Sequence, residues 1–588
     1  MQLTSQRELP LTHVSMSRSL SPSLAALRQR PSAGYARQTG APARPVFVAA
    51  LPAARPAAAA MSAARGGTLE APRPGSHNTA GKRGCSSTQA TAGSAAPMPA
   101  KEAEEGEELK DRAAAGQYAR VLALVPGHGT NGESSPFQGA PWAEVLEHVG
   151  KRLNWTDERL QVQVVPVPAN PTPEALEAIA GGLRRCDVAV GVGLQEGWGA
   201  EWLAARLNGT DNETKMPGTV MFLDCHKSLE GVCRVGGMYL DEGEIMPWRR
   251  AVASWKLPGD RLASALQVSS LVHELWYRHS SDDLLYALLV LVNEYVLDIP
   301  LVSGQLKEKT GLKALMCMLG NCREQVLGCV NDSECKAGLD CLESCAFNDQ
   351  VCSYRCIVSH ESPLLAAFSM CILQKHNCLG NSAPIPMRPE VYPMTHFRGE
   401  PLTRDLADKL FIGWLGLQCC SWRVVAGKNP AYDYFPCQYQ LFYPGKAKGS
   451  MWYEPVFKVT KYDGTQVWRR RRYRMRHAKA PGCYNFSVLD NGVISNEYWR
   501  IVDVSDDLAW GIFYYSGSAS VVGQTYQGAV FVTPDGKWPA EHHLPRITAA
   551  MESAGIKMWE LYDVDQSICT ERDAPLDVTD MRPFDSLV

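Results

Sequence analysis

The hydrophobic residues between about 117 and 305 fall into short apolar runs that alternate with amphipathic stretches. The runs RVLALVPG, LQVQVVPVP, CDVAVGVG and GTVMFLDC are rich in β-branched residues and lead into turn residues, a pattern typical of buried parallel strands. The stretches between and after them predict helices over Trp142–Leu153, Pro173–Arg185, Ala200–Leu207, Arg261–His279, Asp282–Val296 and Gln305–Leu315. This alternation predicts a doubly wound, Rossmann-like α/β domain over residues 116–308, with helices on both faces of the sheet.

A glycine-rich turn, PGHGTNGE, follows the first predicted strand. Such a turn at a helix N-terminus can bind an anion, but its glycines match neither the G-x-G-x-x-G nor the Walker A spacing. We therefore expect His128 in this turn to be an exposed residue rather than a catalytic base. The sequence predicts no particular activity for the α/β domain.

Beyond residue 410 the pattern changes to short extended segments separated by turns such as YDGT, LDNG and TPDG, which are typical of hairpins. Eight strands are predicted, over Ser421–Ala426, Cys437–Tyr443, Met451–Thr460, Thr465–His477, Cys483–Leu489, Glu497–Val504, Trp510–Ser516 and Gly528–Thr533. Their even spacing predicts an up-and-down antiparallel barrel whose interior can hold a small apolar ligand. A helix over His543–Ala554 and an extended segment over Met558–Val564 are expected to follow.

Four arginines alternate along WRRRRYRMRH and should share one face of their strand: Arg470, Arg472, Arg474 and Arg476. A row of like charges needs an anionic neighbour, and three kinds could serve: acidic side chains of the same chain, an anionic reductant, or an anionic lipid surface. Nucleic acid is not an expected partner, because 59 basic and 62 acidic residues give a net charge of -3.

Ten of the 19 cysteines lie between Cys317 and Cys378. So short a segment buries too little apolar surface to hold itself together, so we expect a helical module stapled by disulfides. The pairs Cys341/Cys345 and Cys352/Cys356 have i, i+4 spacing, which places each pair on one helix face. Two such helices would form a hairpin closed by two nested bridges.

Zinc is the alternative for this module, but it favours C-x2-C pairs or closely spaced histidines, and the segment has neither. We therefore expect disulfides and no metal. Disulfides form in an oxidising compartment, and a thioredoxin-type partner could reduce them.

The first hundred residues contain 11 Lys or Arg and only two acids, Glu8 and Glu70. This Arg- and Ser-rich, acid-poor composition predicts an organelle transit peptide, with a plain disordered tail as the alternative. No run reaches the roughly 18 apolar residues of a spanning helix. The expected organisation is a transit segment and linker (1–115), the α/β domain (116–308), the cysteine-rich helical module (309–382), a linker (383–409), the barrel with its C-terminal helix (410–566) and a tail (567–588).

The order of cysteine-rich module and barrel, with CMLGNCREQVLGCVNDSECKAGLDCLESC and later NPAYDYFPCQYQLFY, resembles the violaxanthin de-epoxidases. CIVSHESPLLAAFSMCILQKHNCL, VLDNGVISNEYW and IVDVSDDLAWG are more similar still to the de-epoxidase-related proteins of plants and algae. The resemblance is strong over about 310–565. It implies a chloroplast protein with a lipocalin-like barrel. The expected disulfides, combined with a transit peptide, indicate the thylakoid lumen or a membrane-associated location, with the stroma as the alternative.

The resemblance also implies a bridge pattern: Cys317–Cys335, Cys322–Cys329, Cys341–Cys356, Cys345–Cys352, Cys371–Cys378 and Cys437–Cys569. Cys419, Cys420 and Cys483 would remain as thiols.

For chemistry, the resemblance implies an oxidoreductase that removes the epoxide oxygen of a xanthophyll, with ascorbate as the reducing co-substrate. Such a reaction needs a proton donor at the epoxide oxygen. The family tyrosine matches Tyr515, whereas the family carboxylate aligns with Asn496, and an amide cannot supply the proton. Glu497 is adjacent to Asn496 but is expected on the opposite face of the strand. Glu497 and Asp433 are the two acids that could substitute for the family carboxylate.

Trp422, Tyr526 and Asn496 are the expected ligand-contacting residues. Gln440 and Phe486 align with histidines that help the family to sense pH, so activation by that route is not expected. Two functions therefore stay open: a de-epoxidase-type enzyme that uses Tyr515, and a non-catalytic lipocalin that binds a carotenoid or another lipophilic ligand. Contact with the thylakoid membrane would be peripheral.

Overall fold

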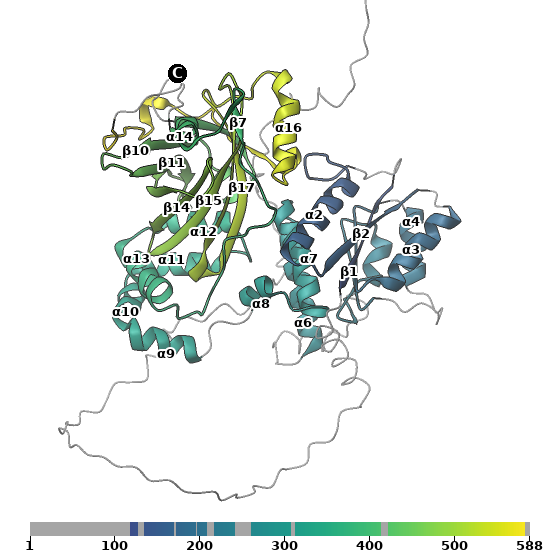
Figure 1. Ribbon diagram of the computed structural model, residues 1–588. Helices are drawn as coiled ribbons and strands as arrows, with labels where there is room; N and C mark the ends of the chain where they lie inside the picture. The colour runs from purple at the N-terminus through teal and green to yellow at the C-terminus, as the bar shows by residue number, and fades with distance from the viewer. Residues whose placement is uncertain are drawn as a thin grey trace, which may run out of the picture. The chain divides into compact units, whose positions relative to one another are not determined.

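The computed structural model describes residues 118–127, 134–169, 172–195, 197–207, 217–240, 260–306, 312–412 and 421–582. Within these ranges the chain forms an α/β domain, a disulfide-bonded helical module and an antiparallel barrel (Figure 1). The expected transit segment, His128, Cys419 and Cys420 lie outside the described residues. No helix in the described ranges combines the length and the apolar character that crossing a membrane requires.

The α/β domain is built on a sheet of strand order β2-β1-β3-β4-β5-β6, of which the first four strands are parallel. The strands are β1 (Ala119–Pro126), β2 (Leu160–Val167), β3 (Val188–Val192), β4 (Thr219–Leu223), β5 (Arg234–Val235) and β6 (Met238–Tyr239). Every residue of β3 and β4 is buried, because helices cover both faces of the sheet.

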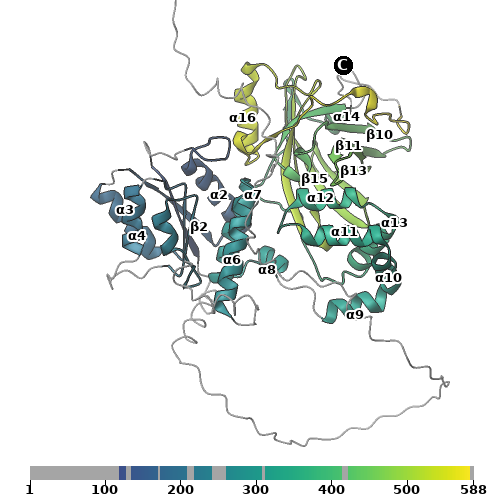
Figure 2. The ribbon, with the colours of Figure 1, turned by 180° about the vertical axis from the view of Figure 1, so that it is seen from behind.

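Two separate hydrophobic cores, one on each face, identify the helices that cover the sheet. On one face lie α2 (Trp142–Thr156), α6 (Arg261–Trp276) and α7 (Ser281–Tyr295); on the other lie α3 (Pro173–Arg185) and α4 (Gly197–Leu207), as Figures 1 and 2 show. This arrangement confirms the doubly wound prediction. The ends of the predicted helix Gln305–Leu315 fall in α8 (Pro300–Leu306) and α9 (Leu312–Asn321), and its residues 307–311 lie outside the described ranges.

The cysteine-rich module consists of short helices. Its helices after α9 are α10 (Arg323–Asn331), α11 (Ser333–Ser344), α12 (Gln350–Ser359), α13 (Pro363–Ser369) and the wider π-helical η4 (Met370–Lys375). Side chains cap the first turns of three of them, α11, α12 and α13. The carboxylates of Asp332 and Asp349 accept from the backbone N–H groups of Cys335 and Cys352, at 2.8 and 2.9 Å. Such caps satisfy donors that each helix start leaves unpaired.

All twelve cysteines expected in bridges are disulfide-bonded, but three of the six expected pairings are wrong. The bridges Cys341–Cys356, Cys345–Cys352 and Cys437–Cys569 form as expected. The structure has Cys317–Cys378, Cys322–Cys371 and Cys329–Cys335 in place of Cys317–Cys335, Cys322–Cys329 and Cys371–Cys378.

The cause of the difference is helix packing. Helix α9 and η4 lie side by side, so Cys317 and Cys322 meet Cys378 and Cys371, with Cα atoms 5.4 and 5.8 Å apart. These separations suit a disulfide. The remaining pair, Cys329 and Cys335, closes the short link between α10 and α11.

The barrel contains all eight predicted strands. They are β9 (Ser421–Gly427), β10 (Tyr439–Pro444), β11 (Met451–Thr460), β12 (Gln466–Arg470) with β13 (Tyr473–His477), β14 (Cys483–Asp490), β15 (Val493–Val504), β16 (Gly511–Ala519) and β17 (Gln524–Thr533). Each strand pairs antiparallel with the next, and β9 pairs with both β10 and β17, which closes the barrel. A closed up-and-down barrel has no free edge.

Outside the barrel wall, α16 (Leu544–Ser553) packs its buried Ile547 and Met551 against a second core that contains Trp510 and Phe531. The short β18 (Tyr562–Asp563) adds to β9. Helix α14 (Arg404–Ile412), which overlaps the segment expected to be a linker, contributes to the interior core of the barrel.

The arginine row is interrupted, because the expected strand Thr465–His477 breaks between β12 and β13. Arg470 and Arg472 both pair with the buried Glu454, and Arg472 also pairs with Asp580. Arg474 and Arg476 are exposed. Acidic side chains of the same chain therefore neutralise Arg470 and Arg472, the first two arginines of the row.

Candidate functional site

A carboxylate on β15 faces the interior of the barrel. Glu497 is 4% exposed and lies opposite Gly517 on β16, which in turn lies opposite Tyr526 on β17. The Tyr526 hydroxyl donates to Glu497 Oε1 at 2.8 Å, and Trp499 Nε1 donates to Oε2 at 2.6 Å. A Cβ atom at Gly517 would lie 2.4 Å from the Tyr526 ring, so glycine is what lets Tyr526 reach across β16.

The next set of cross-strand neighbours on β15, β16 and β17 has the same arrangement. Trp499 lies opposite Tyr515, which lies opposite Gly528. The rings of Trp499 and Tyr515 stack with centroids 5.0 Å apart. A Cβ atom at Gly528 would lie 2.7 Å from the Tyr515 hydroxyl. The two rows place a carboxylic acid, two phenols and an indole together inside the barrel.

A second buried carboxylate lies on the turn after β9. Asp433 ends the short α15 (Pro430–Asp433), is fully buried, and accepts from the backbone N–H of Asn429 at 2.7 Å. A Cβ atom at Gly427 would lie within 2.5 Å of the Asp433 carboxyl group. In the described part of the chain, Asn429 Nδ2, Asp433 Oδ1 and the Tyr515 hydroxyl lack well-aligned hydrogen-bond partners. Buried polar atoms of this kind are rare and often mark function.

Burial controls the protonation of these groups. It raises the pKa of Asp433 to about 8, although the Asn429 N–H and the Lys428 ammonium act in the other direction. Burial likewise raises the pKa of Glu497, against the hydrogen bonds from Trp499 and Tyr526. The pKa of Tyr515 is raised well above its usual value by burial and then by Asp433 and Glu497. Protonated carboxyl groups can therefore persist at a pH where exposed ones are ionised.

The structure corrects the expectations for two predicted site residues. Asn496 is exposed on the outside of the barrel, so the expectation that it contacts a ligand is wrong, as is the expectation that Glu497 faces away from the interior. The reason is the strand register: Glu497 shares its face with Trp499 and Ile501, which belong to the interior core. The size of those two residues is the sequence signal that could have identified Glu497.

Trp422 and Tyr526 both belong to the interior core. Two interior tyrosines were not anticipated, Tyr453 and Tyr473, which flank the site on β11 and β13. The Tyr453 hydroxyl donates to Gln440, one of the positions at which the family histidines were expected to be replaced. Phe486, the other position, stacks on Trp499.

Aromatic side chains fill the interior between these polar groups. Phe411 of α14 stacks on Phe513 with centroids 4.5 Å apart and contacts Phe442 and Tyr484 edge-on. A long ligand would have to displace such rings. Phe411 is the one that comes from a helix rather than from the wall, so moving α14 would open the interior without unpairing strands.

Two groups of side chains hold potential metal-ligand atoms close together: Cys322, Cys371 and His376 form one, and Cys345, Cys352 and Cys356 form the other. Their sulfurs are bonded in bridges, whereas a metal binds the thiolate. The structure therefore assigns these cysteines to stabilisation.

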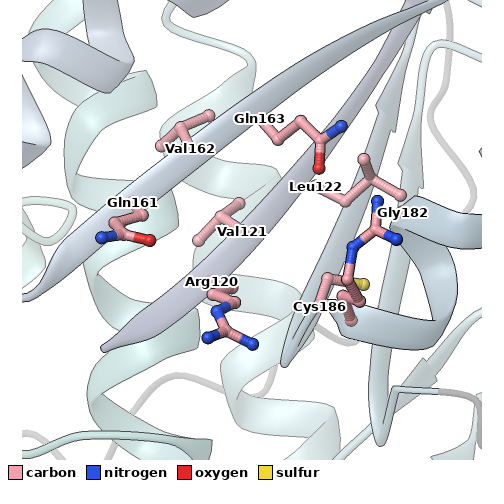
Figure 3. A pocket seen from close by; sticks show the side chains of 9 residues that line it. Arg120, Val121, Leu122, Gln161, Val162, Gln163, Gly182 and Cys186 are labelled. Atoms are coloured by element: carbon pink, nitrogen blue, oxygen red, sulfur yellow. The ribbon is translucent and has the colours of Figure 1, made fainter. Parts of the chain in front are cut away.

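A separate pocket of about 390 Å³ lies on the α/β domain. Figure 3 shows Gln161 and Gln163 on one strand and Arg120 on its neighbour, with Cys186 close by. The pocket contains none of the residues predicted from the sequence to form a site. Its lining mixes polar and apolar residues.

Comparison with known proteins agrees with this architecture. Residues 314–566 match the family model described as the VDE lipocalin domain. The chain is 23% identical to a violaxanthin de-epoxidase, chloroplastic, of Nicotiana tabacum over 252 residues, covering 42% of this chain and 48% of the relative. It is 23% identical to the enzyme of that name from Spinacia oleracea over 256 residues, covering 42% and 49%. The chain thus spans about half the length of these relatives.

Among solved structures, lobster apocrustacyanin A1 is similar over 96% of its own length and 32% of this chain, with 13% identity and a TM-score of 0.21. Apocrustacyanin C1 gives the same identity and score. The assignment of a closed eight-stranded barrel depends on the strand pairing of the molecule itself.

Proposed function

Since the chain is related to the violaxanthin de-epoxidases through residues 314–566, we propose that it is an oxidoreductase that reduces the epoxide of a xanthophyll inside its barrel. The observation that carries the proposal is Glu497, a buried, interior carboxylic acid held by Tyr526 and Trp499 beside Tyr515. Epoxide opening requires a proton donor at the oxygen, and an interior lined by aromatic side chains suits a lipophilic ligand.

In the proposed reaction, Glu497 donates a proton to the epoxide oxygen as a C–O bond breaks. Two electrons come from ascorbate, which is oxidised to dehydroascorbate. The epoxide oxygen leaves as water and its two carbons form a double bond, so that two protons and two electrons are consumed. One proton comes through Glu497, which regains it from solvent, and the other is the proton that the ascorbate monoanion loses when it is oxidised. Tyr515, kept protonated because burial raises its pKa, donates a hydrogen bond toward the departing oxygen, while Tyr526 holds Glu497 in place.

We place the protein in the chloroplast, as in its relatives named chloroplastic. Six disulfides favour the oxidising side of the thylakoid membrane, the lumen, because bridges persist under oxidising conditions. A xanthophyll dissolves in the membrane, so peripheral membrane contact would deliver it.

The test is incubation of the disulfide-bonded protein with violaxanthin and ascorbate at acidic and mildly alkaline pH, followed by pigment chromatography. We expect de-epoxidised product, a loss of at least 100-fold in turnover for Glu497→Gln, and retained pigment binding. Glu400→Gln, at an exposed glutamate of the short strand β8 (Glu400–Pro401), is the matched control and should keep full turnover. Pigment binding without product at either pH would instead establish a non-catalytic carotenoid-binding lipocalin.

A further inference from the structure

A cluster of charged side chains, all buried except the half-buried Asp282, joins the α/β domain to the barrel side of the chain. From α2, His148 Nε2 contacts Glu560 Oε2 at 2.8 Å and Arg152 Nη1 contacts Glu560 Oε1 at 3.2 Å. Ser281 donates to Glu560 at 2.5 Å. Glu560 lies in η7 (Met558–Glu560), after the barrel. The cluster continues on α7, where Asp282 pairs with Arg152.

The cluster reaches the barrel wall through Lys428, the residue that follows β9. Its side chain is 5% exposed, and its Nζ donates to Asp282 Oδ1 at 2.8 Å and to Oδ2 at 3.0 Å. An ammonium group this deeply buried requires a partner, and Asp282 provides it from the α/β domain. Burial alone would raise the pKa of Asp282, but Lys428 and Arg152 outweigh it and lower that pKa.

Lys428 also begins the turn that holds Asp433. Its backbone N–H donates to the Ala529 carbonyl at 3.1 Å, one residue beyond the glycine that faces Tyr515. The next residue, Asn429, donates its N–H to Asp433 Oδ2 at 2.7 Å and accepts from the Asp433 N–H at 2.7 Å. A displacement of Lys428 would therefore move the turn and its carboxyl group.

We propose that Asp282 is a positioning residue for the barrel site: by holding the Lys428 ammonium, it fixes the turn that presents Asp433 next to Tyr515. The α/β domain thereby takes part in building a site that lies in another part of the chain. The proposal rests on the proposed function only in regarding the barrel interior as the site, and its main test needs no substrate.

Asp433 is a suitable reporter because few charged or titratable groups face it. They are Lys428 after β9, Tyr515 on β16 and Tyr453 on β11. Both tyrosines stay neutral because burial raises their pKa values. The titration midpoint of Asp433 therefore depends on where the Lys428 ammonium lies and on whether a carboxylate neutralises it.

The experiment is an infrared pH titration of the full chain, following the carbonyl stretch of protonated Asp433 as the band that Asp433→Asn removes. In Asp282→Asn, the ammonium loses the carboxylate that it contacts directly and keeps only the attraction of Glu560, and we expect the midpoint to fall by ~1 pH unit. In Lys428→Met, the positive charge is gone and the midpoint should rise. In the double variant, Asp282→Asn should add nothing to the effect of Lys428→Met.

Asp298→Asn, an exposed aspartate of the same domain, is the control and should leave the midpoint unchanged. Asp282→Glu keeps the negative charge, so most of the fall in the midpoint should disappear in this variant. It also serves as the test if Asp282→Asn does not fold. An unchanged midpoint in both Asp282 and Lys428 variants, or equal shifts from Asp282→Asn in both backgrounds, would overturn the proposal. If turnover is also found, Asp282→Asn should lower kcat with little change in KM. Absent turnover would count against the proposed function alone.

Discussion

Replacing Asp433 by asparagine should change how the stability of the barrel depends on pH. The side chain is fully buried, and burial raises the pKa of its carboxyl group from 3.8 to about 8. Asparagine has nearly the same shape and can still accept from the Asn429 N–H. The variant therefore removes the proton equilibrium and keeps the packing.

The magnitude follows from linkage between proton binding and folding. Between pH 4 and 8 the folded protein retains a proton on Asp433 that the unfolded chain loses, so the stability present at low pH is lost as pH rises toward 8. A shift of roughly four pKa units, at about 1.4 kcal/mol each, predicts that this group alone costs about 5–6 kcal/mol across the interval. Asp433→Asn should not show this loss.

The assay is denaturation of both proteins with their disulfides intact, monitored by tryptophan fluorescence, at closely spaced pH values from 4 to 8. The difference in unfolding free energy should grow by about 1.4 kcal/mol per pH unit in favour of Asp433→Asn. Glu497 titrates in both proteins and cancels in the difference. Two stability curves that stay parallel over the whole interval would refute the assignment of a protonated, buried Asp433.

Other consequences of the structure can be measured directly. Gly517→Ala should push the Tyr526 ring away from Glu497, because the new Cβ would lie 2.4 Å from the ring, and turnover should fall at least tenfold. The control Gly320→Ala, where nothing lies within 4 Å of the new Cβ, should leave turnover unchanged. Equal turnover of the two variants would contradict the role given to Tyr526. Phe411→Ala should cost about 3–5 kcal/mol of stability yet tighten equilibrium binding of a carotenoid, and weaker binding would count against entry past α14. Removing the Cys437–Cys569 bridge, which spans 132 residues, should lower the unfolding free energy by about 4–5 kcal/mol in non-reducing denaturant titrations.

The sequence alone specified the parts of this protein that depend on local pattern. Period-2 alternation and turn residues identified all eight barrel strands, and alternating apolar runs identified the parallel sheet, because both patterns repeat over many residues. Cysteine density identified the stapled module. The i, i+4 spacing also predicted the hairpin bridges Cys341–Cys356 and Cys345–Cys352, since both helices lie within one short segment.

Only the tertiary structure decided which side chains meet. Two of the unexpected bridges, Cys317–Cys378 and Cys322–Cys371, depend on α9 packing beside η4, a contact that no spacing in the chain encodes. The inward direction of Glu497 depends on the register of β15, where a shift by one residue would exchange the two faces. The link between Asp282 and Lys428 joins residues 146 positions apart. Contacts between distant segments depend on how whole helices and strands pack, so a local sequence pattern does not predict them.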